Sequence, residues 1–507
     1  MSCKPPLRLI LMAAGVAAVA APAMAAPDLA PHDILLLNRV TWGADAASIA
    51  QMQALGPKRW LEEQLHPPAD DGLPAQVQAE IGAMRISTTP FLQLVAETEA
   101  QRLAGAAITD NDQRNAALQA YKQTISMLAV QGIKRSLLRD IYSQNQLKEQ
   151  MTWFWANHFN VFMHKRDIRA MVSDYEDSAI RPHALGRFRD LLEATLRHPV
   201  MQRYLDNAQN GAGHINENYA REIMELHTMG VGSGYTQKDV QELARILTGV
   251  GVDLEPGTPD LKPEQKALYV RDGVFEFNPK RHDFGDKVFL GHTIKGSGYP
   301  EVEEALDILA REPATARHVS LQLAQYFVGD SPSPALVERM SRTFQRTDGD
   351  IPSVLKTMFE SREFDASLGT QFKDPIHYLV SAVRVSYGDR TIINPAPLEK
   401  WLTAMAEGLY DHETPDGYPL TSAAWNGPGQ MAVRFEMARR IAVDGKTLFQ
   451  PPGAAKLDAP QLRPQAALYK ASLTQPLGPQ TREALGQATT AQDWSALFLS
   501  SPEFMRR

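Results

Sequence analysis

Two glutamates in residues 216–227 have the spacing of an acid/base or cation site. On a helix, Glu222 and Glu225 share one face, and Asn218 lies on that face one turn earlier. Two carboxylates placed in this way can divide the acid and base roles or bind a divalent cation. Arg221 is spaced to pair with Glu225, and the alternative interpretation is a set of weak surface ion pairs. We take Glu222 and Glu225 as candidate catalytic residues, and Asn218 and Arg221 as candidate ligand-binding residues.

A second candidate group lies in residues 149–159, where two tryptophans alternate with polar side chains. Trp153 and Asn157 share one helical face, and Trp155 and His158 share another. Aromatic side chains around a few polar groups are typical of ligand sites, although a histidine beside aromatics can also be an ordinary core residue. We take His158 as a candidate catalytic residue, and Trp153, Trp155 and Asn157 as candidate ligand-binding residues.

A third candidate group is a loop with glycine, histidine and charged residues at 281–287. His282 and Asp283 are adjacent there, which suits a pair of metal ligands, and Lys287 follows as a candidate ligand-binding residue. The alternative is that Asp283 makes a turn and has no further role. We name His282 and Asp283 as candidate metal ligands, and a divalent cation as the cofactor that they would bind.

The chemistry available to these groups is that of carboxylates and imidazoles. The single cysteine, Cys3, lies in the predicted signal peptide described below, so the mature chain has no thiol nucleophile and no disulfide. The sequence also has no phosphate-binding loop, nucleophile elbow or His-Glu-x-x-His motif. For a hydrolase-like or cation-dependent enzyme, or a ligand-binding protein, one cleft would unite His158, Glu222, Glu225, His227, His282 and Asp283. For an assembly partner, these residues would be dispersed.

The amino terminus has the three parts of a secretory signal peptide. Lys4 and Arg8 precede an apolar run, and Ala23-Met24-Ala25 forms a small-x-small cleavage site. We expect residues 1–25 to be removed, which leaves no transmembrane anchor and a periplasmic or secreted protein. The formal net charge of the full chain is −7 and its basic residues are scattered, which argues against nucleic acid as a partner.

Helical patterns dominate the mature chain, which we predict to be one large, mainly α domain over residues 26–507. Apolar residues at three- and four-residue steps predict long helices before residue 161, and a helix over 217–229. Thr236, with Asp239 three residues later, predicts a helix start in capping-box style. Short apolar runs among glycines and prolines predict a small β-rich insertion at 251–299, and residues 450–464 predict a proline-rich loop.

Several separate motifs together resemble one large bacterial family, domain of unknown function 1800. The resemblance covers about residues 31–442. It rests on these segments: Leu37-Asn38-Arg39-Val40-Thr41-Trp42-Gly43-Ala44, Trp155-Ala156-Asn157-His158-Phe159, Asn216-Glu217-Asn218-Tyr219-Ala220-Arg221-Glu222, Glu225-Leu226-His227-Thr228, Tyr235-Thr236-Gln237-Lys238-Asp239-Val240, His282-Asp283-x-Gly285-x-Lys287, Leu290-Gly291, Pro313-Ala314-Thr315-Ala316-Arg317 and Ser361-x-Glu363-Phe364.

The resemblance implies an exported, mostly helical protein and no particular reaction. It also implies an alternative role as a non-catalytic binding or assembly partner of a second exported family, domain of unknown function 1501, which is similar to sulfatases and alkaline phosphatases. One departure affects the site. The family usually has Thr-Gly-Trp where this chain has Thr248-Gly249-Val250, so a pocket lined by that tryptophan would be altered here.

Overall fold

The computed structural model describes residues 29–165, 167–255, 257–388, 390–451 and 477–507. The predicted signal peptide at 1–25, and most of the loop predicted at 450–464, lie outside the described residues. Helices make up most of the described chain, and the strands are confined to five short segments between residues 250 and 294. This confirms the predicted fold class, mainly α with a small β-rich insertion.

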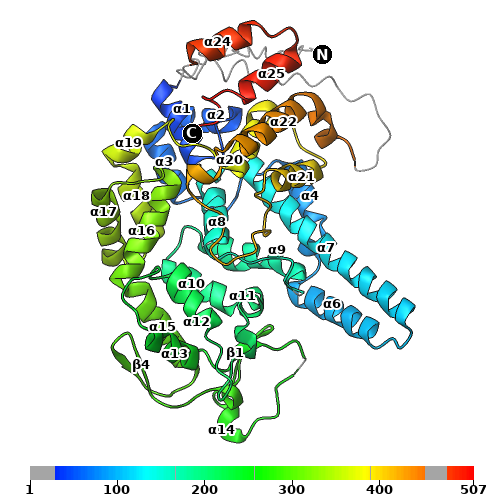
Figure 1. The fold of residues 1–507 in the computed structure, drawn as a ribbon, viewed down its shortest axis with the longest axis vertical. Helices are drawn as coiled ribbons and strands as arrows, with labels where there is room; N and C mark the ends of the chain where they lie inside the picture. The colour runs from blue at the N-terminus through cyan, green and yellow to red at the C-terminus, as the bar shows by residue number, and fades with distance from the viewer. Residues whose placement is uncertain (1–28, 166, 256, 389, 452–476) are drawn as a thin grey trace, which may run out of the picture.

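The first eight helices include α1, α2 and α3 in the upper part of the view and α8 near the centre (Figure 1). Helices α6 and α7 lie antiparallel and project to one side, and together we call them the arm. Almost every residue of α8 is buried. The elements are α1 (Pro31–Val40), α2 (Ala46–Leu55), α3 (Pro57–Leu65), α4 (Ala75–Gly82), α5 (Arg85–Thr88), α6 (Phe91–Ala106), α7 (Asn111–Tyr142) and α8 (Gln146–His158).

The middle of the chain is built from shorter helical segments, two of which are π-helices. These two are η2 (Tyr175–Ile180) and η5 (Ile223–His227). The others are η1 (Ile168–Ala170), α9 (Val172–Asp174), η3 (Arg181–His183), α10 (Phe188–Arg197), α11 (Pro199–Tyr204), η4 (Asn207–Gln209), α12 (Asn218–Glu222) and α13 (Gln237–Ile246).

The predicted helix over 217–229 therefore differs from the structure. It starts as α12 and widens into η5, where the Thr228 hydroxyl donates to the Ile223 carbonyl at 2.6 Å. The next helix, α13, begins as predicted. Asp239 Oδ2 accepts the Thr236 amide, and the Asp239 amide donates to Thr236 Oγ1.

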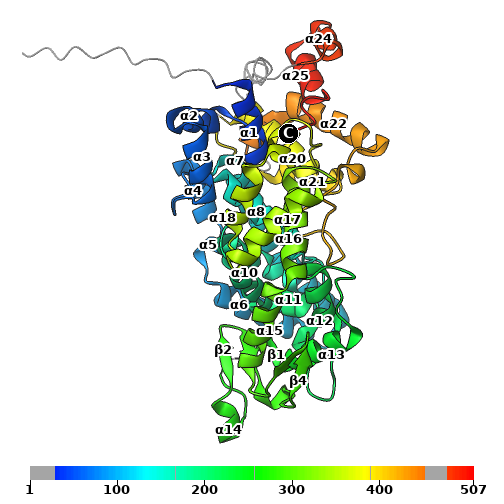
Figure 2. The ribbon, with the colours of Figure 1, turned by 90° about the vertical axis from the view of Figure 1, so that its left-hand side faces the viewer.

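The insertion forms two small antiparallel sheets at one end of the molecule (Figure 2). The first has the order β1-β3-β2, and the second is the hairpin β4-β5. In the first sheet Val250 and Val270 both pair with Phe277. The elements are β1 (Val250–Val252), α14 (Pro263–Lys266), β2 (Val270–Asp272), β3 (Phe275–Phe277), η6 (Pro279–Arg281), β4 (Lys287–Phe289) and β5 (His292–Ile294).

The remaining helices complete the core, and the last of them return to the amino-terminal helices. Helix α20 is almost wholly buried, and α25 packs on α22. The elements are α15 (Tyr299–Arg311), α16 (Pro313–Phe327), α17 (Pro334–Arg346), α18 (Ile351–Phe359), α19 (Arg362–Ser367), α20 (Pro375–Tyr387), α21 (Ala396–Ala404), η7 (Ser422–Ala424), α22 (Pro428–Asp444), η8 (Gly445–Phe449), α24 (Pro479–Gly486) and α25 (Ala491–Leu499).

Candidate functional site

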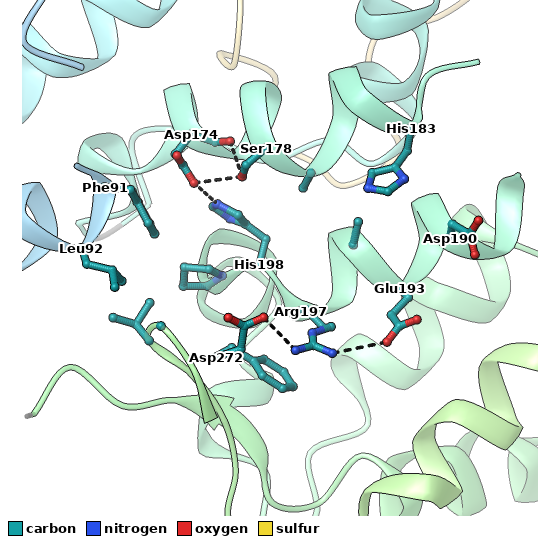
Figure 3. A pocket seen from close by; sticks show the side chains of 16 residues that line it. Phe91, Leu92, Asp174, Ser178, His183, Asp190, Glu193, Arg197, His198 and Asp272 are labelled. Carbon is teal, nitrogen blue, oxygen red and sulfur yellow. Dashed lines mark hydrogen bonds and ion pairs between the residues drawn. The ribbon is translucent and has the colours of Figure 1, made fainter. Parts of the chain in front are cut away.

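A pocket of about 600 Å³ opens where the base of the arm, the π-helix η2, helix α10 and the β2–β3 turn meet (Figure 3). Its volume is that of a small-molecule site. Its lining combines apolar side chains with charged and imidazole groups. The lining residues are Phe91, Leu92, Asp174, Ser178, Ala179, His183, Asp190, Glu193, Ala194, Arg197, His198, Pro199, Asp272, Gly273, Val274 and Phe275.

On one side of the pocket, Asp174 holds a histidine and a serine. His198 lies between α10 and α11, and its Nδ1 accepts the Val200 amide at 3.3 Å. Its Nε2 therefore carries the proton and donates to Asp174 Oδ2 at 3.2 Å. Ser178 lies one turn along η2 and donates to the same oxygen at 2.9 Å. Burial lowers the pKa of His198, although Asp174 opposes this shift.

Farther along the pocket, His183 lies in the field of two carboxylates. Burial lowers the pKa of His183, while Asp190 and Glu193 each oppose the shift. Among the described residues, the ring nitrogens of His183 have no hydrogen-bond partner and Asp190 has no ion-pair partner. Because the imidazole is half-buried and largely neutral at pH 7, it can accept a proton from a bound molecule.

Arg197, at the end of α10, ties the pocket to the β insertion. Its guanidinium pairs with Asp272 at 2.8 Å and with Glu193 at 3.5 Å. The same group lies over the Phe275 ring, 5.0 Å from the ring centroid. These contacts join α10 to the turn between β2 and β3, and they fix the apolar side of the pocket.

The arm meets the insertion across the pocket through a close contact. Gly273 has a left-handed φ of 60°, and a Cβ at this position would lie 3.0 Å from Leu92 Cδ2. The neighbouring Phe91 ring lies 5.7 Å from the His198 ring. Residues far apart in the sequence therefore close the pocket together, and the left-handed φ of the turn favours glycine at position 273.

The structure keeps Glu222 and Glu225 close to each other but places neither in this pocket. Glu222 forms no ion pair with the described residues, and burial, followed by the charge of Glu225, raises its pKa. Arg221 lies 3.5 Å from Glu225 and 3.2 Å from Glu217. The Asn218 side chain donates to the Leu205 carbonyl at 3.1 Å. These residues form a partly exposed polar group around α12 and η5.

His158 lies instead in an aromatic core. Its Nε2 is 3.0 Å from the His227 carbonyl oxygen and its Nδ1 is 2.5 Å from Gln322 Oε1. The two imidazole rings of His158 and His227 lie 6.1 Å apart, and Trp155 packs at 5.3 Å from His158. Burial lowers the pKa of His158 to about 4, so its ring is neutral at pH 7.

The other residues of the tryptophan segment face different surroundings. Trp153 stacks on Tyr326, with ring centroids 5.7 Å apart. Asn157 binds the backbone of Tyr418 twice, since its side-chain amide donates to the carbonyl and its side-chain oxygen accepts the amide. These contacts hold α8 to the loop that follows α21.

The side chains of His282, Asp283 and Lys287 form hydrogen bonds and ion pairs with other residues of the chain. His282 Nδ1 lies 2.7 Å from the Thr248 carbonyl and its Nε2 lies 2.9 Å from Glu301. Lys287 pairs with the same Glu301. The side chains of His282, Lys287 and Glu301 are fully buried. Asp283 pairs with Arg245 at 2.8 Å, and that ion pair lowers its pKa to about 2.

The predicted site residues form three separate groups: Glu222 with Glu225, His158 with His227, and His282 with Asp283 and Lys287. They do not line the pocket described above, and the single cleft expected for an enzyme built from them is not found among the described residues. Sequence reasoning missed the pocket residues Asp174, Ser178, His183, Asp190 and His198. Asp174 and Ser178 have helical spacing, but nothing in the sequence connects them to His198 or to the arm. In the described ranges, no three His, Cys, Asp or Glu side chains could hold a metal ion.

Comparisons with known proteins place the chain in one family. A family model described as "Protein of unknown function (DUF1800)" matches residues 35–506. No curated protein and no solved structure matches the chain. Within the described residues, every helix is too short or too polar to cross a membrane.

Proposed function

Since the chain belongs to the family of proteins of unknown function DUF1800, we propose its function from the pocket beside α10. The protein is exported, binds a small polar ligand in this pocket and carries out acid/base chemistry on it. The observation that supports this proposal most strongly is His183, a half-buried imidazole with no hydrogen-bond partner among the described residues, located beside Asp190 in a cavity of about 600 Å³.

The two sides of the pocket have different roles in this proposal. His183 accepts a proton from the ligand, and Asp190 and Glu193 stabilise the imidazolium that results. Asp174 is already oriented by Ser178 and His198, so its other carboxylate oxygen, Oδ1, can hold a hydroxyl or amino group of the ligand.

The π-helix η2 supports the proposal independently. Asp174 precedes η2 directly, and Ser178 and Ala179 belong to it. A π-turn has poorer packing and hydrogen bonding than an α-turn, and such turns occur frequently at functional sites. The chemistry is the carboxylate and imidazole chemistry expected from the composition, although different residues supply it.

The test fills the pocket without removing a charge. Ala194 lines the pocket, so Ala194→Trp would occupy it, while Ala100→Trp adds the same side chain at an exposed position of α6. A library of small polar compounds is screened by thermal shift, and ester, glycoside and phosphate substrates are screened for turnover. We expect hits that Ala194→Trp abolishes and Ala100→Trp preserves.

His183→Gln then separates binding from chemistry. It should keep ligand affinity within a few-fold and lower turnover by about 10²- to 10⁴-fold. Hits that survive Ala194→Trp would place the ligand elsewhere and contradict the proposal. Turnover that is unchanged in His183→Gln would contradict the role of this histidine.

A further inference from the structure

We propose that the ligand of this pocket carries a positive charge: it is an organic ammonium compound with an apolar or aromatic part. The inference rests on the proposed function and names the chemical class that the pocket would bind. It follows from the balance of charges inside the pocket, and from the apolar side chains that line the pocket with those charges.

Arg197 provides the only arginine or lysine charge in the lining, and that charge is already neutralised. It pairs with both Asp272 and Glu193. Glu193 also accepts a hydrogen bond from Arg189, which lies outside the lining. The guanidinium of Arg197 is thus held between two carboxylates and against Phe275, and it does not neutralise the rest of the pocket.

Asp174 and Asp190 are the two lining carboxylates that have no lysine or arginine partner in the described chain. The partners of Asp174 are the Ser178 hydroxyl and the His198 ring. Asp190 faces His183. Because burial favours the neutral form of both imidazoles, neither histidine supplies a full positive charge at pH 7. The pocket therefore keeps a net negative charge.

Apolar side chains line the same pocket as these carboxylates. Phe91 and Leu92 come from the arm, Val274 and Phe275 from the insertion, and Pro199 from α11. Carboxylates without a cationic partner attract a cation, and the apolar side chains beside them bind hydrocarbon. A ligand with an ammonium group at one end and an aromatic or aliphatic body matches both properties, whereas an anionic ligand would meet unneutralised carboxylates.

The test uses three probes that have nearly the same shape and differ in charge: 2-phenylethylammonium, 2-phenylethanol and phenylacetate. Their affinities for the full mature protein are measured at pH 7 by calorimetry. We expect the ammonium to bind at least about tenfold more tightly than the alcohol, and phenylacetate not to bind. Asp190→Asn should weaken ammonium binding and leave alcohol binding nearly unchanged, and Asp174→Asn should weaken ammonium binding more than alcohol binding.

Asp112→Asn is the matched control for overall charge. Asp112 is exposed at the tip of the arm, where the 16 residues of α6 separate the tip from the pocket by roughly 24 Å. This variant should bind the ammonium as the parent does. An equal loss in Asp112→Asn, or ammonium binding that survives Ala194→Trp, would show attraction to the acidic surface and overturn the inference.

The outcomes separate this inference from the proposed function. If the alcohol binds as tightly as the ammonium, and Ala194→Trp abolishes both, the pocket is a ligand site but its ligand is not selected by charge. If the ammonium does not bind at all, the inference is wrong, and the compound library decides the proposed function on its own.

Discussion

The guanidinium of Arg39 donates to the carbonyl oxygen of Arg507, 468 positions later in the sequence, at 2.6 Å. The same guanidinium binds the Ser367 carbonyl and hydroxyl and the Phe327 carbonyl. Arg39 is fully buried, and burial, followed by the charge of Arg507, lowers its pKa. One side chain of α1 therefore connects α16, α19 and the last described residues.

Replacing Arg39 should destabilise the whole fold. Arg39→Ala leaves the buried carbonyl oxygens of Phe327 and Arg507 without this donor, and each such group costs about 1–3 kcal/mol. We expect the free energy of unfolding to fall by about 3 kcal/mol or more in urea titrations. The exposed Arg59→Ala should change it by less than about 0.5 kcal/mol. Equal effects of the two variants would contradict this role of Arg39.

In the buried group of Lys287, Glu301 and His282, the effects of mutations on the free energy of unfolding should be strongly coupled. Burial alone would raise the pKa of Glu301, but its hydrogen bonds from His282 and Lys287 outweigh burial and lower it. Lys287→Met leaves Glu301 Oε2 without its buried cation and should cost about 3–5 kcal/mol of unfolding free energy. The double variant Lys287→Met/Glu301→Gln should cost less than the sum of the single variants. Additive costs would show that the pair is not coupled.

Acid should destabilise the protein through its buried histidines. The pKa of His158 is about 4 in the folded state, because of burial and then the nearby His318, and near 6.5 when unfolded. Above pH 6.5 the titration of His158 therefore does not reduce the free energy of unfolding. As the pH falls to 4, the unfolded chain takes up a proton that the folded chain does not. This difference lowers the free energy of unfolding by about 3 kcal/mol. His158→Gln should reduce this pH dependence, whereas His66→Gln, at an exposed position, should not.

Glu222→Gln should raise the melting temperature at pH 7. Burial and the charge of Glu225 raise the pKa of Glu222, so its ionised form is less favourable in the folded chain than in the unfolded chain. The gain should vanish below about pH 4, where both states of the parent hold the proton. Glu217→Gln is the matched control, because Glu217 pairs with Arg221 and should show no gain. A lower melting temperature for Glu222→Gln at pH 7 would contradict this expectation.

Export should produce a mature chain that begins at Ala26. Amino-terminal sequencing of the protein from the periplasm or medium measures this directly. Ala25→Phe should block cleavage, because the cleavage site requires a small side chain. A chain in the periplasm or medium that still begins at Met1 would show that the segment is retained.

The sequence predicted the parts of the fold that depend on local interactions. The start of α13 followed from Thr236 and Asp239, because a capping box involves only residues three apart. The widening of the helix at η5 was missed, because it accompanies the packing of His227 against α8, a contact between distant segments. The pocket was missed for the same reason. Leu92 and Gly273 meet only after the arm and the insertion have packed.

Because η2 is a π-helix, the number of residues in it determines the direction of the side chains that follow it. A helix with i→i+5 bonding holds one residue more in its turn than an α-helix, so every side chain after it is rotated by roughly 100°. Removal of one residue from η2 would restore α-helical bonding and turn His183 away from Asp190 and Glu193. This segment can therefore accept exchanges of one amino acid for another more readily than any change in its length.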